Sequence, residues 1–560
     1  MKNILKLSVA ALALSFSVSS CIQEINPQSS TITKDQAANA PGAFNNFVSS
    51  ITNSLCGKNL YGNSVSSYPW DYGMPTFFLQ RDVMGNDIAI GGGNNWYITW
   101  YSCGTGLGPG YAYCQAPWTI YYSWIKNCNN VISLAGEEPE DEFKTGAGIA
   151  YAMRAMFYMD LARMFAQETY GDNPQAPTVP ITTEKTTGEE AQHNPRATNE
   201  EMWKFIIEDL NKAEEYLAGY KRENVYTPDL SVVYGLKARA YLVMEDWANA
   251  KTYAKNAYSM NNYSIMTADQ YTSRNDGFNT PNSAWMFGVT FQTSDPCMTD
   301  NDADSSWGSW MILEVTGSEC GYAADYGGPM YIDRHLYESM PDTDCRKKCF
   351  IDFAIDEETE FGSDEMIEAL SDYSDVPEGL LITADAADGY VGGLSLKFRP
   401  KGGEHNNQYI GFNVAVPMMR VEEMYLIEAE AAGMLNESDG VNLLKAFVAH
   451  RDPAYVYGNH TDQYKVGDPL TTFQLECWWQ RRAEFWGEGM ATFDIKRLNR
   501  GIIRSYPGTN HCEGYRWNLL DGHPVWMDLC IVQTETNYNQ DCVNNPTPLK
   551  PSADSDEYKW

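Results

Sequence analysis

A dense run of charged residues in the last quarter of the sequence is the first candidate for acid–base chemistry. A general acid needs a raised pKa, but neighbouring guanidinium groups stabilise an ionised carboxylate and lower its pKa. We therefore interpret the run as a structural ion-pair network that locks a helix to a neighbouring loop, and we predict no catalytic residue in it. The charged residues of the run are Arg481, Arg482, Glu484, Glu488, Asp494, Lys496 and Arg497.

Two aromatic stretches suit binding better than catalysis. One follows three glycines, and the other lies in a segment rich in Asp, Ser and Gly. A sugar ring has an apolar C–H face and a polar rim, so a flat aromatic ring beside an amide matches it. The alternative is that these rings are core, since aromatic side chains dominate buried packing. The predicted glycan-binding residues are Asn94, Trp96, Tyr97, Trp100, Trp307 and Trp310.

Two acidic stretches are candidates for calcium binding. The segment from Asp300 to Asp304 begins like a calcium loop, but its sixth and twelfth positions are Ser305 and Met311 instead of Gly and Glu. Residues 351–388 hold thirteen Asp and Glu and no Lys or Arg, which is typical of a solvated acidic surface, with a cation-binding loop as the alternative. We expect no cofactor and no metal, and calcium stays open as the alternative.

Other catalytic signatures are missing from the sequence. It has no G-x-S-x-G, H-E-x-x-H or G-x-x-x-x-G-K-[ST] motif, and its seven His residues lack metal-ligand spacing. Glycoside hydrolysis needs two carboxylates that flank the glycosidic bond. Because this chain is so rich in Asp and Glu, the sequence offers too many carboxylate pairs to select one. Besides Cys21 there are twelve cysteines, which permit disulfides or buried thiols in an exported protein, with a pairing that sequence does not give.

Composition narrows the class of ligand. The 560 residues include 40 Lys and Arg against 74 Asp and Glu, a formal charge of −34, with 43% hydrophobic and 13% aromatic residues. Such a chain can bury a large core, which excludes a disordered protein. Its acidity argues against nucleic acid and anionic lipid headgroups, whose affinity depends on Lys and Arg. A neutral ligand is compatible with this charge.

The N-terminal residues predict export. Lys2 and Lys6 precede an apolar stretch that ends in small residues before Cys21, the pattern of a signal peptide over residues 1–20. The apolar stretch is too short for a permanent membrane span. Its last residues, Val18-Ser19-Ser20-Cys21, resemble a bacterial lipobox, so we predict lipidation of Cys21. Ordinary secretion with a cysteine near the cut is the alternative.

Helical periodicity dominates the rest of the chain. Thr198 and Glu201 have capping-box spacing and predict a helix through Leu217. Two following segments predict a helical hairpin, in which Ala250, Ala254 and Ala257 permit close approach, as in a tetratricopeptide unit. The predicted helices are 118–134, 147–165, 198–217, 230–242, 246–258, 420–435 and 477–500, with a further helix entry in 28–55.

The remaining segments predict a cap on this scaffold. Residues 265–410 are rich in Gly, Asp, Tyr and Trp, with β-like runs at 284–291 and 394–398, and no Pro/Ser linker divides the chain. We predict a mainly α fold: a tetratricopeptide-like helical-hairpin scaffold with a large loop-rich cap that contains short β-strands. Residues 21–560 form one predicted domain, with the scaffold mainly at 28–55, 118–260 and 418–500 and the ligand face mainly at 61–113 and 265–410.

Six blocks in order resemble the SusD/RagB family of Bacteroidetes surface lipoproteins. The most specific is Arg481–Arg497, RRAEFWGEGMATFDIKR, which is similar to the family's Arg-Arg-x-Glu, Glu-Gly and Phe-Asp-x-x-Arg pattern. The other five blocks are WTIYYSWIKNCNNVI (118–132), GAGIAYAMRAMFYMDLARMF (146–165), NPRATNEEMWKFIIEDLNKAEEYL (194–217), LKARAYLVMEDWANAKTYA (236–254) and MRVEEMYLIEAEAA (419–432).

The resemblance implies a role in nutrient uptake. It implies a non-catalytic, lipid-anchored protein on the cell-surface side of the outer membrane, partnered with a SusC-like TonB-dependent transporter to which it delivers oligosaccharides. A peptide or another nutrient in the same transporter-lid role is the first alternative, and a surface glycosidase on this scaffold is the second. The blocks match the scaffold, and because the family's binding loops vary, they assign no ligand residue.

Overall fold

The computed structural model describes residues 42–59, 69–91, 95–316, 321–323, 328–385 and 389–560. Two compact units divide the chain after Asn46. The first is described only at the start of helix α3 (Ala43–Asn53), and the features below belong to the second, Phe47–Trp560. The predicted signal peptide and Cys21 lie outside the described residues, so these predictions, and that of a single domain over 21–560, stay predictions.

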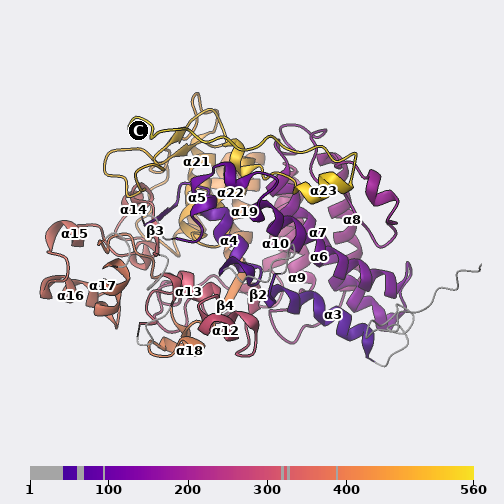
Figure 1. The fold of residues 1–560 in the computed structure, drawn as a ribbon, viewed down its shortest axis with the longest axis horizontal. Helices are drawn as coiled ribbons and strands as arrows, with labels where there is room; N and C mark the ends of the chain where they lie inside the picture. The colour runs from indigo at the N-terminus through magenta and orange to yellow at the C-terminus, as the bar shows by residue number, and fades with distance from the viewer. Residues whose placement is uncertain (1–41, 60–68, 92–94, 317–320, 324–327, 386–388) are drawn as a thin grey trace, which may run out of the picture. The chain divides into compact units, whose positions relative to one another are not determined.

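A series of antiparallel helices forms the scaffold. Consecutive helices pack against each other from α6 through α10, and α10 then packs on α19, which contacts α20 and α21 (Figure 1). This arrangement confirms the prediction of a mainly α, tetratricopeptide-like scaffold. The helices are α6 (Ala112–Ala135), α7 (Asp141–Phe165), α8 (Asn199–Tyr216), α9 (Leu230–Val243), α10 (Trp247–Tyr258), α19 (Val421–Leu435), α20 (Glu437–Val448), α21 (Thr472–Glu484), α22 (Ala491–Arg497) and α23 (Gln533–Tyr538).

Local sequence signals explain where these helices begin and how they pack. Thr198 and Glu201 form the predicted capping box at the start of α8, which satisfies backbone N–H groups that have no partner inside a helix. Asp246 caps α10 by accepting from the backbone N–H of Asn249. On α10 the three small residues Ala250, Ala254 and Ala257 are buried where this helix contacts α9 and α19.

The predicted helix at 477–500 is wrong in one respect, because two helices occupy this stretch. Helix α21 ends at Glu484 and α22 begins at Ala491. Between them Gly487 and Gly489 adopt positive φ angles of 75° and 77°, a left-handed conformation that interrupts a right-handed helix. A Cβ atom at Gly489 would lie 2.8 Å from backbone and side-chain atoms of Phe78, so the chain passes closely over α4 (Pro75–Asp82).

Over its described residues, the cap is built from short helices and three two-stranded sheets. Strand β1 (Ile88–Ile90) pairs with β3 (Met330–Ile332), β2 (Trp285–Thr290) with β4 (Ala415–Arg420), and β5 (Ile502–Ile503) with β6 (Asn518–Leu519), all antiparallel. The remaining cap helices are α5 (Ile98–Ser102), α11 (Ala268–Tyr271), α12 (Pro296–Thr299), α13 (Trp307–Met311), α14 (Arg334–Ser339), α15 (Ala354–Glu358), α16 (Asp364–Ser371), α17 (Pro377–Asp385) and α18 (Gln408–Gly411).

The two β-like runs have different outcomes. The run at 284–291 forms strand β2, as predicted. The run at 394–398 is not a strand, because only Leu394 and Ser395 make isolated bridges, to Tyr331 and Phe350. Leu394 and Leu396 instead belong to a buried hydrophobic cluster with α16 and α17, so the apolar character of this run comes from packing in the cap.

The acidic segment 351–388 folds into α15, α16 and α17 over its described part, and these helices lie together at one side in Figure 1. Apolar residues such as Met366 and Leu370 face a core, whereas Asp364 and Glu365 lie in the first turn of α16. Acidic residues in a first turn interact favourably with the helix dipole. The segment therefore has the character of a helical, solvated acidic surface.

All eleven described cysteines are free thiols, and nine of them are buried. Several sulfhydryl groups donate to backbone carbonyls, as Cys103 does to Trp100 O and Cys512 to Ile90 O. Burial raises the pKa of the Cys103 thiol to about 12, so this group stays protonated. The sequence permitted either disulfides or buried thiols, and the described cysteines are thiols, most of them buried.

Candidate functional site

The first predicted aromatic stretch lies in a cluster of rings drawn from separate segments of the cap. Trp96 precedes α5, and its ring centre lies 5.8 Å from that of Trp70 and 6.0 Å from that of Tyr322. Trp70 also contacts Trp100 at 5.3 Å and Tyr113 at 5.5 Å. We call these rings, together with Tyr97 and Trp310, the aromatic cluster.

The second predicted stretch joins the cluster through one residue only. Trp310 on α13 lies 5.1 Å from Tyr97 and stacks on Tyr322 at 4.9 Å with an interplanar angle of 4°. Trp307 on the same helix packs instead on Phe398 at 4.8 Å. The fold thus brings Trp96, Tyr97, Trp100 and Trp310 together, as a shared site requires, and places Trp307 in a neighbouring part of the core.

Burial divides the predicted residues. Trp96 is 39% exposed, whereas Tyr97, Trp100, Trp307 and Trp310 have no exposed surface. The structure therefore does not present these four rings as exposed stacking surfaces: Tyr97, Trp100 and Trp310 lie inside the aromatic cluster, and Trp307 packs on Phe398. Their part in glycan binding stays a prediction. Asn94 lies outside the described residues. Its neighbour Asn95 has a structural role, accepting from Tyr97 N at 2.8 Å and donating to Gly328 O at 3.0 Å.

The aromatic cluster contains buried donors that the described chain leaves without partners. They are the hydroxyl of Tyr97 and the indole Nε1 atoms of Trp100 and Trp310, and Trp307 Nε1 shares this state. Burial raises the pKa of Tyr97 well above its usual value, and the nearby Asp71 charge adds to this shift, so the hydroxyl keeps its proton. Buried polar groups are nearly always hydrogen-bonded. Water, a ligand or residues outside the described ranges must satisfy these donors.

Three members of the cluster were not predicted from the sequence. Trp70, Tyr113 and Tyr322 come from a 3-10 turn (Pro69–Asp71), the start of α6 and the segment after α13. The available signal for Trp70 was its position after Pro69, in a segment rich in Asn and Ser. No local pattern marked the two tyrosines.

The charged run at 481–497 forms the predicted ion-pair network. Glu484 is fully buried and pairs with three arginines from different segments: Arg451 at 2.9 Å, Arg420 at 3.1 Å and Arg346 at 3.6 Å. These guanidinium groups hold the pKa of Glu484 well below its usual value of 4.5, although burial alone would raise it. The other pairs are Arg481–Asp494, Arg482–Asp87, Lys397–Glu488, Arg420–Glu488, Lys496–Asp528, Arg497–Glu430 and Arg497–Asp494.

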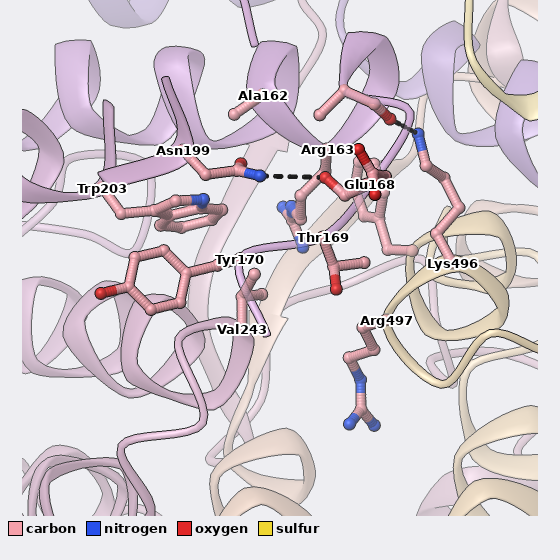
Figure 2. A pocket seen from close by; sticks show the side chains of 12 residues that line it. Ala162, Arg163, Glu168, Thr169, Tyr170, Asn199, Trp203, Val243, Lys496 and Arg497 are labelled. Carbon is pink, nitrogen blue, oxygen red and sulfur yellow. Dashed lines mark hydrogen bonds between the residues drawn. The ribbon is translucent and has the colours of Figure 1, made fainter. Parts of the chain in front are cut away.

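A cavity between α7, α8 and α22 is too small to be a ligand site, and polar side chains that line it already have hydrogen-bond partners (Figure 2). It encloses about 30 Å³, close to the volume per molecule in liquid water. Asn199 donates to Glu168 O at 3.0 Å, and Lys496 donates to Ala166 O at 2.6 Å, as the dashed lines in Figure 2 show. The cavity is therefore a packing gap in the scaffold.

The candidate calcium loop distributes its carboxylates over separate partners. Asp300 accepts from Lys58 at 3.1 Å and from Tyr72 at 3.0 Å. Asp302 accepts from the hydroxyl of Tyr409, and Asp304 accepts from the backbone N–H of Gly321. Within the described ranges no group of three or more His, Cys, Asp or Glu side chains is arranged to hold a metal ion. The prediction of no metal, with calcium as the alternative, is not tested by this arrangement.

Two family models match consecutive parts of the chain. The first is described as "starch-binding associating with outer membrane" and matches residues 86–242, and the second, the SusD family, matches residues 360–547. The chain belongs to the SusD/RagB family. The ion-pair run and helices α6, α7 and α8, which carried much of the resemblance in the sequence, lie inside the matched ranges. A search of curated proteins gave no match.

Solved SusD-like structures have the same fold. A SusD-like carbohydrate-binding protein from Bacteroides vulgatus is 23% identical, with a TM-score of 0.67 over 90% of this chain and 97% of that one. A SusD superfamily protein from the same species is 18% identical, with a TM-score of 0.66 over 93% and 100%. Surface glycan-binding protein A from Bacteroides thetaiotaomicron, solved with laminarihexaose, is 14% identical, with a TM-score of 0.61 over 90% and 98%.

Among the helices of the described ranges, none combines the length and the apolar character that crossing a bilayer requires.

Proposed function

We propose that this SusD/RagB protein is a non-catalytic, surface-exposed lipoprotein that captures oligosaccharides and delivers them to a SusC-like TonB-dependent transporter. The observation that carries the proposal is the aromatic cluster, which presents Trp96 at the surface of a fold shared with glycan-binding relatives. An exposed indole offers the apolar face on which a sugar ring stacks. The cluster behind it fixes the orientation of this indole.

The charge of the chain supports a neutral ligand. A protein with a net charge of −34 repels anionic polymers over much of its surface. Stacking on Trp96 requires no basic patch. In the charged run, arginines lower the pKa of Glu484 and of Asp494, which supports a structural role for these carboxylates instead of general acid catalysis. Attachment to the outer membrane rests on Cys21 and the family.

Affinity gel electrophoresis of the soluble form that begins after Cys21, across neutral plant, host and microbial polysaccharides, tests the proposal. At least one polysaccharide should retard the wild-type protein, and Trp96→Ala should abolish that retardation without lowering the midpoint of thermal unfolding. Trp560→Ala is the matched control, because Trp560 is 40% exposed and stacks on His335 outside the cluster. Equal retardation of wild type and Trp96→Ala would reject the cluster as the site.

The transporter role with a peptide ligand predicts a different result. Under that alternative no neutral polysaccharide retards the protein, and binding of a basic peptide weakens steeply as salt screens the acidic surface. Glycan binding should instead be nearly independent of ionic strength. Release of reducing ends from a bound polysaccharide would contradict the non-catalytic part of the proposal.

A further inference from the structure

Two open grooves meet beside the connection between α8 and α9. The Thr290 groove lies between α3, this connection and the end of β2, with a volume of about 490 Å³. The Asn261 groove, on the other side of the connection, has a volume of about 560 Å³ and reaches the turn after α10. Asn224 lines both grooves. Each volume lies in the range of about 300–1,000 Å³ that small-molecule sites occupy.

The polar groups in these grooves are mostly uncharged. In the Thr290 groove Asp295 is the one charged lining residue, beside hydroxyl and amide groups such as Thr52, Thr290 and Gln292. The Asn261 groove has two acidic and two basic lining residues, whose charges cancel. The Thr290 groove thus carries one negative charge and the Asn261 groove none. On a chain with a net charge of −34, surfaces with so little net charge favour an uncharged polar ligand over an ionic one.

The base of the Asn261 groove is rigid. Arg222 and Asp229 form a buried ion pair at 3.2 Å, and Arg222 also donates to Met286 O at 2.6 Å and to the hydroxyl of Tyr263 at 2.5 Å. Asn261 donates to Asp229 at 2.8 Å. This network fixes Tyr263 and Asn261 in the groove wall, so a ligand there meets a preformed surface.

Several groove side chains keep unused hydrogen-bonding capacity. The Oδ1 atom of Asn224 accepts from Tyr226 N at 2.9 Å, while its Nδ2 atom has no partner in the described chain. Trp285, which lines the Asn261 groove, is fully buried, and its Nε1 atom also has no partner there. Amides can both donate and accept, which suits the adjacent hydroxyl groups of a sugar.

Hydrogen bonds connect the Thr290 groove to the segment that carries Trp70. Leu55 and Cys56 line the groove, and Cys56 donates to Thr290 O at 2.9 Å. On its other side this segment accepts from the turn after Trp70, through Met74 N to Leu55 O at 2.9 Å. Leu55, which lines the groove, is therefore hydrogen-bonded directly to the turn that follows Trp70, whose ring contacts Trp96.

We infer that the Thr290 and Asn261 grooves are a distal arm of the carbohydrate site, which binds further residues of a neutral oligosaccharide whose first residues stack on Trp96. The inference rests on the proposed function and adds that the affinity depends on the length of the oligosaccharide. Short oligosaccharides occupy the aromatic cluster alone, and longer ones gain affinity by filling the grooves.

An array of neutral oligosaccharides, graded from disaccharides to octasaccharides of glucans, mannans, xylans and galactans, tests this arm. The variants are Asn224→Asp, which keeps the Oδ1 acceptor but loses the donor, and Gln292→Glu at another lining position of the Thr290 groove. Gln533→Glu, an exposed amide at the start of α23, controls for the added negative charge. We expect each groove variant to lose roughly tenfold in affinity for the longest bound oligosaccharides and to bind the shortest like wild type.

The outcomes separate the two proposals. If the wild-type protein binds no oligosaccharide, the proposed function fails, and the distal arm fails with it. If Trp96→Ala loses binding but both groove variants match Gln533→Glu at every length, the function stands and the distal arm is overturned. An equal loss at all lengths also overturns the arm, because it would place these amides at the first residues. Both groove positions are at the surface, and unchanged thermal unfolding confirms that each variant is folded.

Discussion

The ion-pair network around Glu484 and the aromatic cluster around Trp96 are both largely buried, yet their polar side chains differ in whether they have hydrogen-bond partners in the described chain. Glu484 receives hydrogen bonds or ion pairs from three arginines that come from separate segments. In the aromatic cluster, Tyr97, Trp100 and Trp310 each bury a donor that no described residue accepts. Both oxygens of Glu484 have arginine partners, and in its network an atom such as Arg481 Nη1 that lacks one belongs to a side chain already paired, here with Asp494. In the cluster, the unpartnered Tyr97 hydroxyl and these indole N–H groups have no hydrogen bond in the described chain and are left for water or a ligand. This difference separates a structural centre from a candidate binding centre.

The largest expected effect comes from breaking the network. Glu484→Gln leaves Arg346, Arg420 and Arg451 without their shared charge, and removing one partner of a buried ion pair costs about 3–5 kcal/mol. Urea denaturation should show a loss of this size in the free energy of unfolding. Glu365→Gln in the first turn of α16, which changes an acid outside this network, should stay within about 0.5 kcal/mol of wild type. Equal stability of both variants would contradict the assignment of Glu484.

The same network predicts how the stability difference depends on pH. The folded-state pKa of Glu484 lies below the ordinary 4.5, so its contribution is present above pH 4.5 and is lost as pH falls through the folded value. The difference in unfolding free energy between wild type and Glu484→Gln should therefore be constant from pH 7 to 5 and shrink below about pH 4.5. A constant difference down to pH 3 would show that Glu484 stabilises through packing alone.

Two tryptophan substitutions sharpen the comparison between satisfied and unsatisfied donors. Trp486 is buried and donates through Nε1 to Asp87 O at 2.7 Å, whereas Trp100 Nε1 has no partner in the described chain. Trp486→Phe should cost about 0.5–1.5 kcal/mol more than Trp100→Phe, because only the first removes a hydrogen bond made within the described chain, while Asp87 O keeps its bond from Asp333 N. Thermal and urea unfolding of the two variants measure this difference. A greater cost for Trp100→Phe would mean that its indole nitrogen is already satisfied.

The smallest expected effect lies where the cluster meets the rest of the cap. Tyr101, next to Trp100, contacts His511 Nδ1 at 2.6 Å. Burial lowers the pKa of His511 below 6.5, so the unfolded chain takes up a proton first, and stability should fall by at most about 1.4 kcal/mol per pH unit below pH 6.5. His511→Gln should flatten this slope in denaturation experiments from pH 7.5 to 5.5. His193→Gln, at a position 58% exposed, should leave the slope unchanged.

The scaffold could be predicted because its signals are local. The Thr198–Glu201 capping box and the small residues of α10 act within a few turns of one helix, and both are seen in the structure. The break at Gly487 and Gly489 was missed, because glycine tolerates a helix at a modest cost. Its left-handed conformation is imposed by packing on α4.

The candidate site was predicted only in part. Trp96, Tyr97, Trp100 and Trp310 gather as a shared site requires, but an aromatic side chain gives no local sign of whether it lies in the core or at the surface. Burial placed all but Trp96 out of reach of a ligand in this conformation. Trp70 contacts Trp96 and Trp100, but these residues belong to different segments, and no local sequence pattern predicts that the segments meet.

By itself the sequence determined the helical scaffold, the family and the structural character of the charged run, because periodicity, capping and the order of charges act over short distances along the chain. Tertiary structure alone decided which arginines surround Glu484, which tryptophan reaches the surface, and that two neutral grooves meet at Asn224. These features depend on contacts between residues far apart in the chain, as between Arg346 and Glu484, and such contacts exist only once the helices and the cap have packed.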